Sequence, residues 1–309
     1  MDQSRPSRVV VAGGTGLVGR PLVQALLDQG HPVTVLTRNP SALRLPAGAE
    51  AQAWTTLPAV LEGAGAVINL AGEGIADRRW SAARKAVIRD SRIQATRRIV
   101  EAMGACTRPP GALVNASAIG FYLPINGGPG DGSLDEAAAP GRGFLAEVCR
   151  AWEAEAMAAA AFGTRVARIR IGVVLAREGG ALPKMALPVR LFQGSKLGSG
   201  TQGLSWIHLD DLVAMLVEAT RNPAWEGPFN GTAPEPLSQE AFTRALARRL
   251  HRPVLPIPAF LTAGALRLLL GELADALLLQ GAYVLPARAQ ALGFAFRFPT
   301  AQAALEDLL

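Results

Sequence analysis

A glycine-rich segment near the start of the chain has the composition of a loop that holds a phosphate group. Gly13, Gly16 and Gly19 recur at every third position, between an apolar run at residues 8–12 and a segment with helical spacing of leucines. Glycine permits a tight turn close to a ligand, and free N–H groups at a helix start attract anions. The alternative is a turn used for packing alone. We expect a dinucleotide pyrophosphate to be held by Gly13, Thr15, Gly16, Leu17, Val18 and Gly19.

The residue that follows the second apolar run bears on the choice of cofactor. Arg38 lies nineteen residues after Gly19, at the end of residues 32–37. A site for NAD(H) carries Asp or Glu here to bind the ribose 2′-hydroxyl, whereas a guanidinium can bind a 2′-phosphate. We therefore expect NADP(H); the alternative for Arg38 is a solvated arginine at a strand end. The small-residue turn after another strand adds three candidate cofactor contacts, Leu70, Ala71 and Gly72.

Two hydroxyl side chains are the candidate catalytic residues. Ser117 ends the apolar run that begins at residue 112, where its hydroxyl could stabilise a substrate oxygen; the alternative is a cap or turn serine. Tyr122 could supply a phenol for proton transfer. With an ordinary pKa of about 10, Tyr122 would be a poor base at neutral pH unless a cation such as Lys85 lay beside it. Packing or hydrogen bonding is the alternative role.

A basic segment offers candidate substrate contacts. Lys85, Arg89 and Arg92 have the spacing that places side chains on one helix face. Such a face beside a cofactor cleft suits a substrate that carries a phosphate or a carboxylate, and a solvated helix surface is the alternative. We expect substrate contacts from Glu73, Lys85 and Arg92.

The segments that must position these residues alternate between strand and helix. Apolar runs rich in β-branched residues are followed by segments with helical spacing, and this alternation predicts an α/β fold with a doubly wound parallel sheet, the Rossmann arrangement. The expected strands are residues 8–12, 32–37, 66–71, 112–116 and 165–175. The expected helices are residues 21–29, 88–103 and 144–161.

Beyond residue 175, glycine and proline interrupt shorter segments, which indicates a small C-terminal α/β lobe interleaved with the last sheet elements. We assign residues 1–175 and 205–232 to the NAD(P)-binding domain, and residues 176–204 and 233–309 to the small lobe. A strongly apolar helix is expected at residues 260–279. We expect it to be buried or to form a subunit interface, such as that of a homodimer, rather than to contact a membrane.

The composition argues against several other classes of protein. The chain has 309 residues, of which 50% are apolar and 18% charged, with a net charge of +6. The basic residues are dispersed, which argues against a nucleic-acid partner. Two cysteines without a CxxC pair and three scattered histidines argue against a disulfide framework and a metal site. We expect a cytoplasmic protein with a small-molecule substrate and no membrane partner, because we find neither a signal peptide nor an apolar stretch long enough to span a bilayer.

Taken together, these motifs resemble the extended, NAD(P)-dependent epimerase/dehydratase-like branch of the short-chain dehydrogenase/reductase superfamily. More narrowly, the chain is similar to the atypical group that ends in a C-terminal domain of unknown function. The resemblance covers nearly the whole chain. It is carried by residues 13–19, 69–73, 76–80, 84–85, 91–92, 116–122, 144–148, 179–182, 205–211 and 230–234.

The superfamily's usual catalytic pair is missing from this sequence. Its Tyr-x-x-x-Lys motif supplies a phenol for proton transfer and a lysine that lowers the pKa of that phenol. Phe144 and Val148 stand at those positions, and neither can move a proton. The resemblance therefore implies an NADP(H)-binding, epimerase-like oxidoreductase with a different proton donor, acting on a small polar substrate that is nucleotide-sugar-like or anionic. The alternative is a non-catalytic protein that senses NADP(H) or serves as a scaffold.

Overall fold

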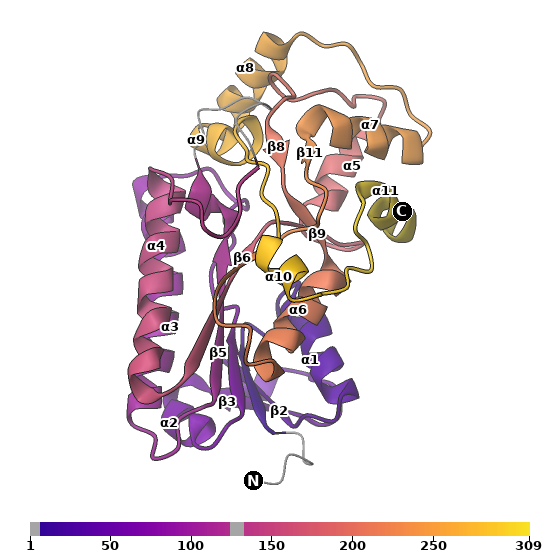
Figure 1. The fold of residues 1–309 in the computed structure, drawn as a ribbon. Coiled ribbons are helices and arrows are strands. Elements are labelled where there is room, and N and C mark those ends of the chain that lie inside the picture. The colour runs from indigo at the N-terminus through magenta and orange to yellow at the C-terminus, as the bar shows by residue number, and fades with distance from the viewer. Residues whose placement is uncertain (1–6, 124–132) are drawn as a thin grey trace.

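The computed structural model describes residues 7–123 and 133–309. Its centre is a parallel sheet of seven strands (Figure 1). The strands are β1 (Val9–Ala12), β2 (Val33–Thr37), β3 (Ala49–Ala53), β4 (Ala66–Asn69), β5 (Ala112–Ala118), β6 (Arg165–Ile171) and β10 (Gly227–Gly231). Their order in space is β10-β6-β5-β4-β1-β2-β3, so the winding direction reverses between β1 and β4. The predicted doubly wound α/β fold is confirmed.

Helices cover both faces of this sheet (Figure 1). On one face, α1 (Gly19–Asp28) and α6 (Leu209–Arg221) pack on alternate residues of the strands, such as Val9 and Val11. On the other face, α2 (Leu57–Leu61), α3 (Ala82–Gly104) and the helical segment after α4 (Phe144–Met157) pack on the intervening residues, such as Val10. Since strand side chains alternate between faces, a β-branched run that is apolar throughout can serve both layers.

The observed elements differ from the sequence prediction at several places. The edge strand β3 was not predicted, because its sequence Ala-Glu-Ala-Gln-Ala has no β-branched residue. The run expected at residues 165–175 is divided into β6 and β7 (Val173–Leu175), and a Cβ at Gly172 would collide with the backbone of Ser205. The continuous helix expected at residues 260–279 is wrong, because Gly271, at φ 61°, ends α8 (Ala259–Leu270).

The rest of the chain builds a second packed region. Two small sheets pair β7 with β9 (Trp206–His208) and β8 (Gly203–Leu204) with β11 (Leu237–Ser238). Their neighbours α5 (Leu182–Arg190), α7 (Gln239–Arg249) and α11 (Ala301–Leu308) share one hydrophobic cluster that includes Leu182, Phe242 and Leu305. The remaining helical elements are α9 (Glu272–Ala274), a π-helical turn (Asp275–Leu279) and α10 (Ala287–Ala291).

Residues 282–288 return from this second region to the large sheet. The Ser205 hydroxyl donates to the carbonyl of Ala282 at 2.7 Å and accepts from the Val284 amide at 2.8 Å. The Asn230 amide group donates to the carbonyl of Leu285 at 2.9 Å, and Thr232 donates to the carbonyl of Val284 at 3.1 Å. The tail is thus tied to the end of β10 by buried polar groups.

Among the described residues, the helix α8 leaves much of its apolar face exposed. Phe260 and Leu268 are 74% and 78% exposed. The sequence prediction that this segment is buried is therefore wrong for α8. The alternative, a subunit interface, stays a prediction.

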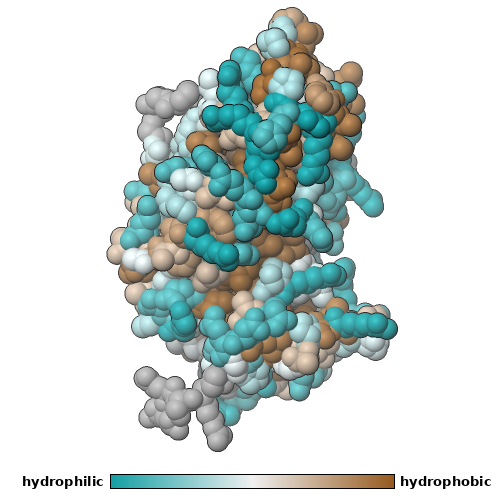
Figure 2. All heavy atoms as spheres, turned by 90° about the vertical axis from the view of Figure 1, so that its right-hand side faces the viewer, coloured by the Kyte–Doolittle hydropathy of each residue, from teal (hydrophilic) through white to brown (hydrophobic). Residues whose placement is uncertain are grey.

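Figure 2 shows the face of the molecule on the side of α1 and α11, where hydrophilic side chains surround hydrophobic atoms gathered in the middle. Within the described parts of the chain, no helix is long and apolar enough to cross a membrane.

Candidate functional site

The glycine loop lies between the end of β1 and the start of α1, against the turn that follows β4. Gly13 has φ of +81°, and a Cβ there would approach the carbonyl group of Leu70 to 2.8 Å. A Cβ on Gly19 would overlap the carbonyl oxygen of Gly13. These two glycines are required by the protein's own packing, because any side chain would separate the loop from its neighbours.

Gly16 differs from the other two glycines because its Cβ position is open. The nearest atom to a Cβ there is the carbonyl oxygen of Gly13, at 3.4 Å, and both Thr15 and Gly16 are exposed. The N-cap residue of α1, Val18, makes no side-chain capping bond. The loop therefore presents exposed backbone and an uncapped helix start, which is the arrangement that holds a pyrophosphate.

A buried amide fixes the turn that faces this loop. Asn69 donates to Thr96 at 2.8 Å and to Asn115 at 2.7 Å, while its carbonyl oxygen accepts from the Ala71 amide at 3.1 Å. Leu70 lies next to Gly13 and Gly72 is exposed, so the three residues predicted to contact the cofactor flank the glycine loop. This anchoring role of Asn69 was not predicted from the sequence, although the residue belongs to the motif that carries the resemblance.

Arg38 is exposed directly after β2, the strand beside β1. Among residues 7–123 and 133–309, no ion pair involves its guanidinium. Within these ranges the Arg38 side chain thus lies free at the carboxyl end of β2, where the sequence predicts a site for a 2′-phosphate.

Ser117 belongs to a buried network of charged groups. It is 2% exposed, and its hydroxyl donates to Glu153 at 2.7 Å. Arg170 holds the same carboxylate with two hydrogen bonds of 2.8 and 3.0 Å, and Arg168 adds a third of 3.2 Å. The Ser117 hydroxyl therefore hydrogen-bonds to the carboxylate of a buried ion pair.

Tyr122 is joined to the same network from the other side. Its hydroxyl donates to Asn230 and accepts from Arg170, each at 2.8 Å. Burial raises the pKa of Tyr122 despite the opposing effect of the Arg170 charge. The cation beside Tyr122 is thus Arg170 rather than Lys85, and the phenol ionises less readily than that of an exposed tyrosine.

A neighbouring thiol in α4 gives a prediction about stability at high pH. Burial, with a smaller effect of the Glu153 charge, raises the pKa of Cys149 from 9.0 to about 11. The thiol then ionises first in the unfolded chain, so stability falls as pH rises from 9 to 11, by at most about 3 kcal/mol. We expect urea titrations at several pH values to show a decline that is smaller in Cys149→Ala. An equal decline in both proteins would contradict the prediction.

The predicted substrate residues do not form one cationic face. Arg92 lies below Gly72 and over the ring of Trp152, at 5.4 Å from its centroid, and burial lowers its pKa. Arg89 is exposed and pairs with its neighbour Asp90. Glu73 pairs with Arg84 at 3.8 Å.

Lys85 instead reaches the C-terminal region. Its ammonium lies 2.9 and 3.0 Å from the two carboxylate oxygens of Glu272, and 5.5 Å from the centroid of the Phe144 ring. Nothing in the sequence pattern pointed to Glu272, which lies 187 residues from Lys85.

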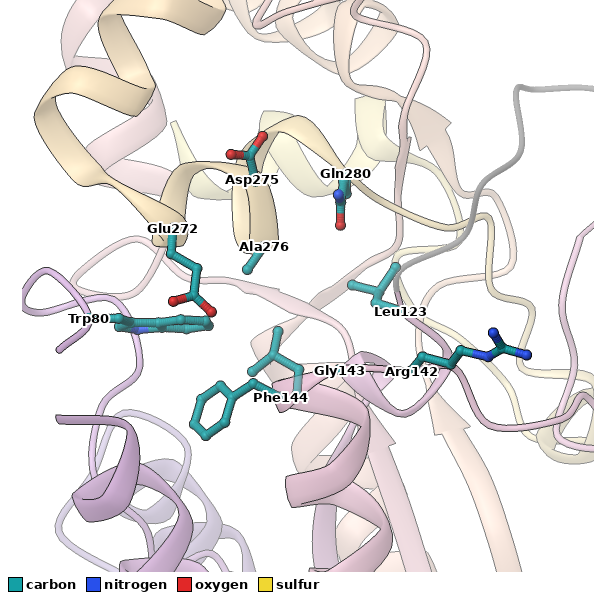
Figure 3. Close-up of a pocket in the computed structure, with 10 residues that line it drawn as sticks. Trp80, Leu123, Arg142, Gly143, Phe144, Glu272, Asp275, Ala276 and Gln280 are labelled. Atoms are coloured by element: carbon teal, nitrogen blue, oxygen red, sulfur yellow. The ribbon is translucent and has the colours of Figure 1, made fainter. Parts of the chain in front are cut away.

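A pocket that is partly open to solvent lies between the start of α4 and the C-terminal region around Glu272 (Figure 3). Trp80 and Phe144 form one side, with ring centroids 5.2 Å apart in an edge-to-face arrangement. Glu272, Asp275 and Gln280 come from the opposite side. Ser117 and Tyr122 do not line this pocket, whereas Phe144, the first residue of α4, does.

The described residues contain no group of three or more His, Cys, Asp or Glu side chains that could hold a metal ion. Aromatic rings, carboxylates, an amide and the Arg142 guanidinium are among the groups that line the pocket.

Comparison with known proteins gives consistent matches along the chain. Residues 9–230 match the NAD dependent epimerase/dehydratase family, and residues 261–308 match a domain of unknown function, DUF1731. An Arabidopsis thaliana relative, "Epimerase family protein SDR39U1 homolog, chloroplastic", is 42% identical over 97% of this chain and 86% of the relative. A Mycobacterium bovis relative, "Epimerase family protein Mb2239", is 39% identical over 96% of both chains.

A solved structure extends the comparison to three dimensions. The crystal structure of human epimerase family protein SDR39U1 (isoform 2) with NADPH is 32% identical and has a TM-score of 0.85. The match covers 97% of this chain and 98% of the human one. The resemblance inferred from the sequence motifs is confirmed: this chain belongs to the NAD-dependent epimerase/dehydratase family.

Proposed function

We propose that this protein is an NADP(H)-binding, epimerase-like oxidoreductase that acts on a small polar substrate. The observation that carries the proposal is the open backbone at Gly16, beside glycines that the protein's own packing requires. The methyl group of an alanine at Gly16 would contact only the carbonyl oxygen of Gly13, so the space over Gly16 is open to a ligand. The NADPH bound in the human relative supports the same choice of cofactor.

The residues around the loop fit such a cofactor. Backbone N–H groups of the segment from Thr15 to Gly19 would hold the pyrophosphate, and Leu70, Ala71 and Gly72 would line the adjacent wall. The Arg38 guanidinium would bind the 2′-phosphate. When bound, the nicotinamide ring would accept or donate a hydride.

We place the substrate in the pocket between Trp80, Phe144 and the C-terminal region. Aromatic rings can pack against the apolar parts of a polar ligand, and carboxylates and an amide can bind its hydroxyl groups. Lys85 reaches the pocket wall through Glu272, whereas Arg92 and Glu73 lie nearer to the cofactor turn. A nucleotide-sugar-like or anionic substrate stays the expected class.

One observation favours a second candidate function. Ser117 and Tyr122 are engaged in the buried network, and the resemblance to the superfamily puts Phe144 and Val148 at the positions of its usual catalytic pair. A protein that binds NADP(H) and turns nothing over would show the same features. Turnover of any substrate would exclude this alternative, and turnover that persists in both Ser117→Ala and Tyr122→Phe would exclude these two hydroxyls as the proton donors.

Arg38→Ala tests the cofactor assignment. We expect NADPH to bind about 10–100-fold more weakly to the variant, because the loss of a bidentate phosphate contact costs roughly 1.5–3 kcal/mol. NADH binding should stay within about twofold, since that cofactor has no 2′-phosphate. Fluorescence titration of both nucleotides measures the effect. Equal weakening of NADPH and NADH would contradict the assignment, and binding of neither to the wild type would contradict the proposed function.

A further inference from the structure

Two carboxylates line the substrate pocket, and their surroundings differ. Asp275 is held by Arg267 through hydrogen bonds of 2.9, 3.0 and 3.2 Å, and its carboxylate points away from Phe144 (Figure 3). Glu272 points from α9 toward Trp80, on the wall where Phe144 also lies (Figure 3). Of these two carboxylates, Glu272 is the one aimed across the pocket.

The other polar groups near the pocket are unsuited to proton exchange. Arg142 lines the pocket, but a guanidinium has only hydrogen-bond donors and no acceptor for a proton. The hydroxyls of Ser117 and Tyr122 are bound inside the network of Glu153 and Arg170, away from the pocket. Among the described lining residues, this leaves Glu272 as the group that is both aimed across the pocket and able to accept and return a proton.

Lys85 fixes the position of this carboxylate. It contacts both oxygens of Glu272 from α3, and its ammonium also lies over the ring of Phe144. The exposed fractions of the Lys85 and Glu272 side chains are 31% and 51%, so a ligand can reach the pair. A lysine that is held between a ring and a carboxylate restricts the rotamers of both partners.

We propose that Glu272 is the catalytic acid–base residue of this pocket and that Lys85 is its positioning residue. The inference rests on the proposed oxidoreductase function. In the oxidation direction, the O–H bond of a substrate hydroxyl breaks and the proton forms a new O–H bond on the Glu272 carboxylate. The electron pair of the adjacent C–H bond leaves as hydride to an oxidised nicotinamide dinucleotide, and the carbon becomes a carbonyl. The reduction direction returns the same proton from Glu272.

The test compares full-length wild type with Glu272→Gln, Lys85→Met and Lys85→Arg. Glu147→Gln is the matched control, because Glu147 is exposed in the first turn of α4. The probes are UDP-glucose and UDP-glucuronic acid with NADP⁺, and phenanthrenequinone with NADPH. Turnover is followed by absorbance of the reduced cofactor and by chromatography of the sugars. Calorimetry measures binding of the probe and of NADPH, and thermal denaturation reports on folding.

We expect Glu272→Gln to lower kcat at least about 100-fold, the usual contribution of a general acid or base. KM, the binding of the probe and of NADPH, and the melting temperature should change little, because glutamine keeps the shape. Lys85→Met should lower kcat about tenfold, and Lys85→Arg should restore most of it, since a cation again holds the carboxylate. Glu147→Gln should match the wild type.

Two results would overturn the inference while leaving the proposed function intact. The first is full kcat in Glu272→Gln; the second is a parallel loss of kcat, NADPH binding and melting temperature, which would indicate a purely structural bridge. If wild type binds NADPH but turns over none of the probes, the oxidoreductase proposal fails and this inference fails with it.

Discussion

Arg170→Met is expected to lower the free energy of unfolding by about 3–5 kcal/mol, because it removes one partner of a buried ion pair. Arg170 and Glu153 are 4% and 3% exposed. The variant loses two hydrogen bonds to Glu153, one to Tyr122 and the contact with the Phe121 ring, whose centroid lies 3.5 Å from the guanidinium. Glu153 then stays buried, with Ser117 and Arg168 as its remaining partners. Urea denaturation measures the loss.

The exposed pair of Arg244 and Glu240 provides the control. These residues lie one turn apart on α7, and their side chains are 62% and 31% exposed. Arg244→Met should therefore change the free energy of unfolding by less than about 1 kcal/mol. A loss below about 1 kcal/mol in Arg170→Met would show that the internal pair contributes no more than an exposed one. The double variant Glu153→Leu, Arg170→Met should lose less than Arg170→Met, because it leaves no buried carboxylate.

Alanine substitutions in the glycine loop are expected to separate packing from ligand binding. Gly19→Ala should weaken NADPH binding at least about 100-fold, roughly 3 kcal/mol, because its methyl group overlaps the carbonyl oxygen of Gly13 and forces α1 away from the loop. The same displacement should lower the melting temperature. NADPH titration and thermal denaturation of the same preparation measure both effects.

Gly16→Ala is the informative partner of that variant. Its methyl group would lie 3.4 Å from the nearest protein atom, so we expect a change in the free energy of unfolding of less than about 1 kcal/mol. NADPH binding should still weaken at least about tenfold, because the methyl group fills the space that the pyrophosphate approaches. If Gly16→Ala bound NADPH as well as the wild type does, the pyrophosphate would not lie above this residue.

The sequence predicts the central sheet well because buried parallel strands have a strong local signal. β1, β2 and β4 are short apolar runs rich in β-branched residues, as strands covered on both faces require. The edge strand β3 carries no such signal, since its pairing with β2 is decided by the tertiary structure. At α8, apolar spacing continues past Gly271, and only the positive φ of that residue ends the helix.

The candidate site likewise has one part that the sequence predicts and another part that it does not. The glycine loop and Arg38 are local in sequence, so their types and spacing alone indicate a nucleotide site. The pocket, by contrast, is formed by Trp80, Phe144 and Glu272, which only the folded chain brings together. The surroundings of Tyr122 could not be predicted from the sequence either, because its partners Arg170 and Asn230 come from the distant strands β6 and β10.

The return of residues 282–288 to β10 has a consequence for how this protein can be divided. One family match ends at residue 230 and the other begins at residue 261, as though two modules had been joined. A chain cut between them would leave Ser205, Asn230 and Thr232 without the carbonyl partners that the tail provides. The nucleotide-binding half and its tail therefore form one structural unit, and we expect a truncation or domain exchange to keep the end of β10 intact only if it retains residues 282–288.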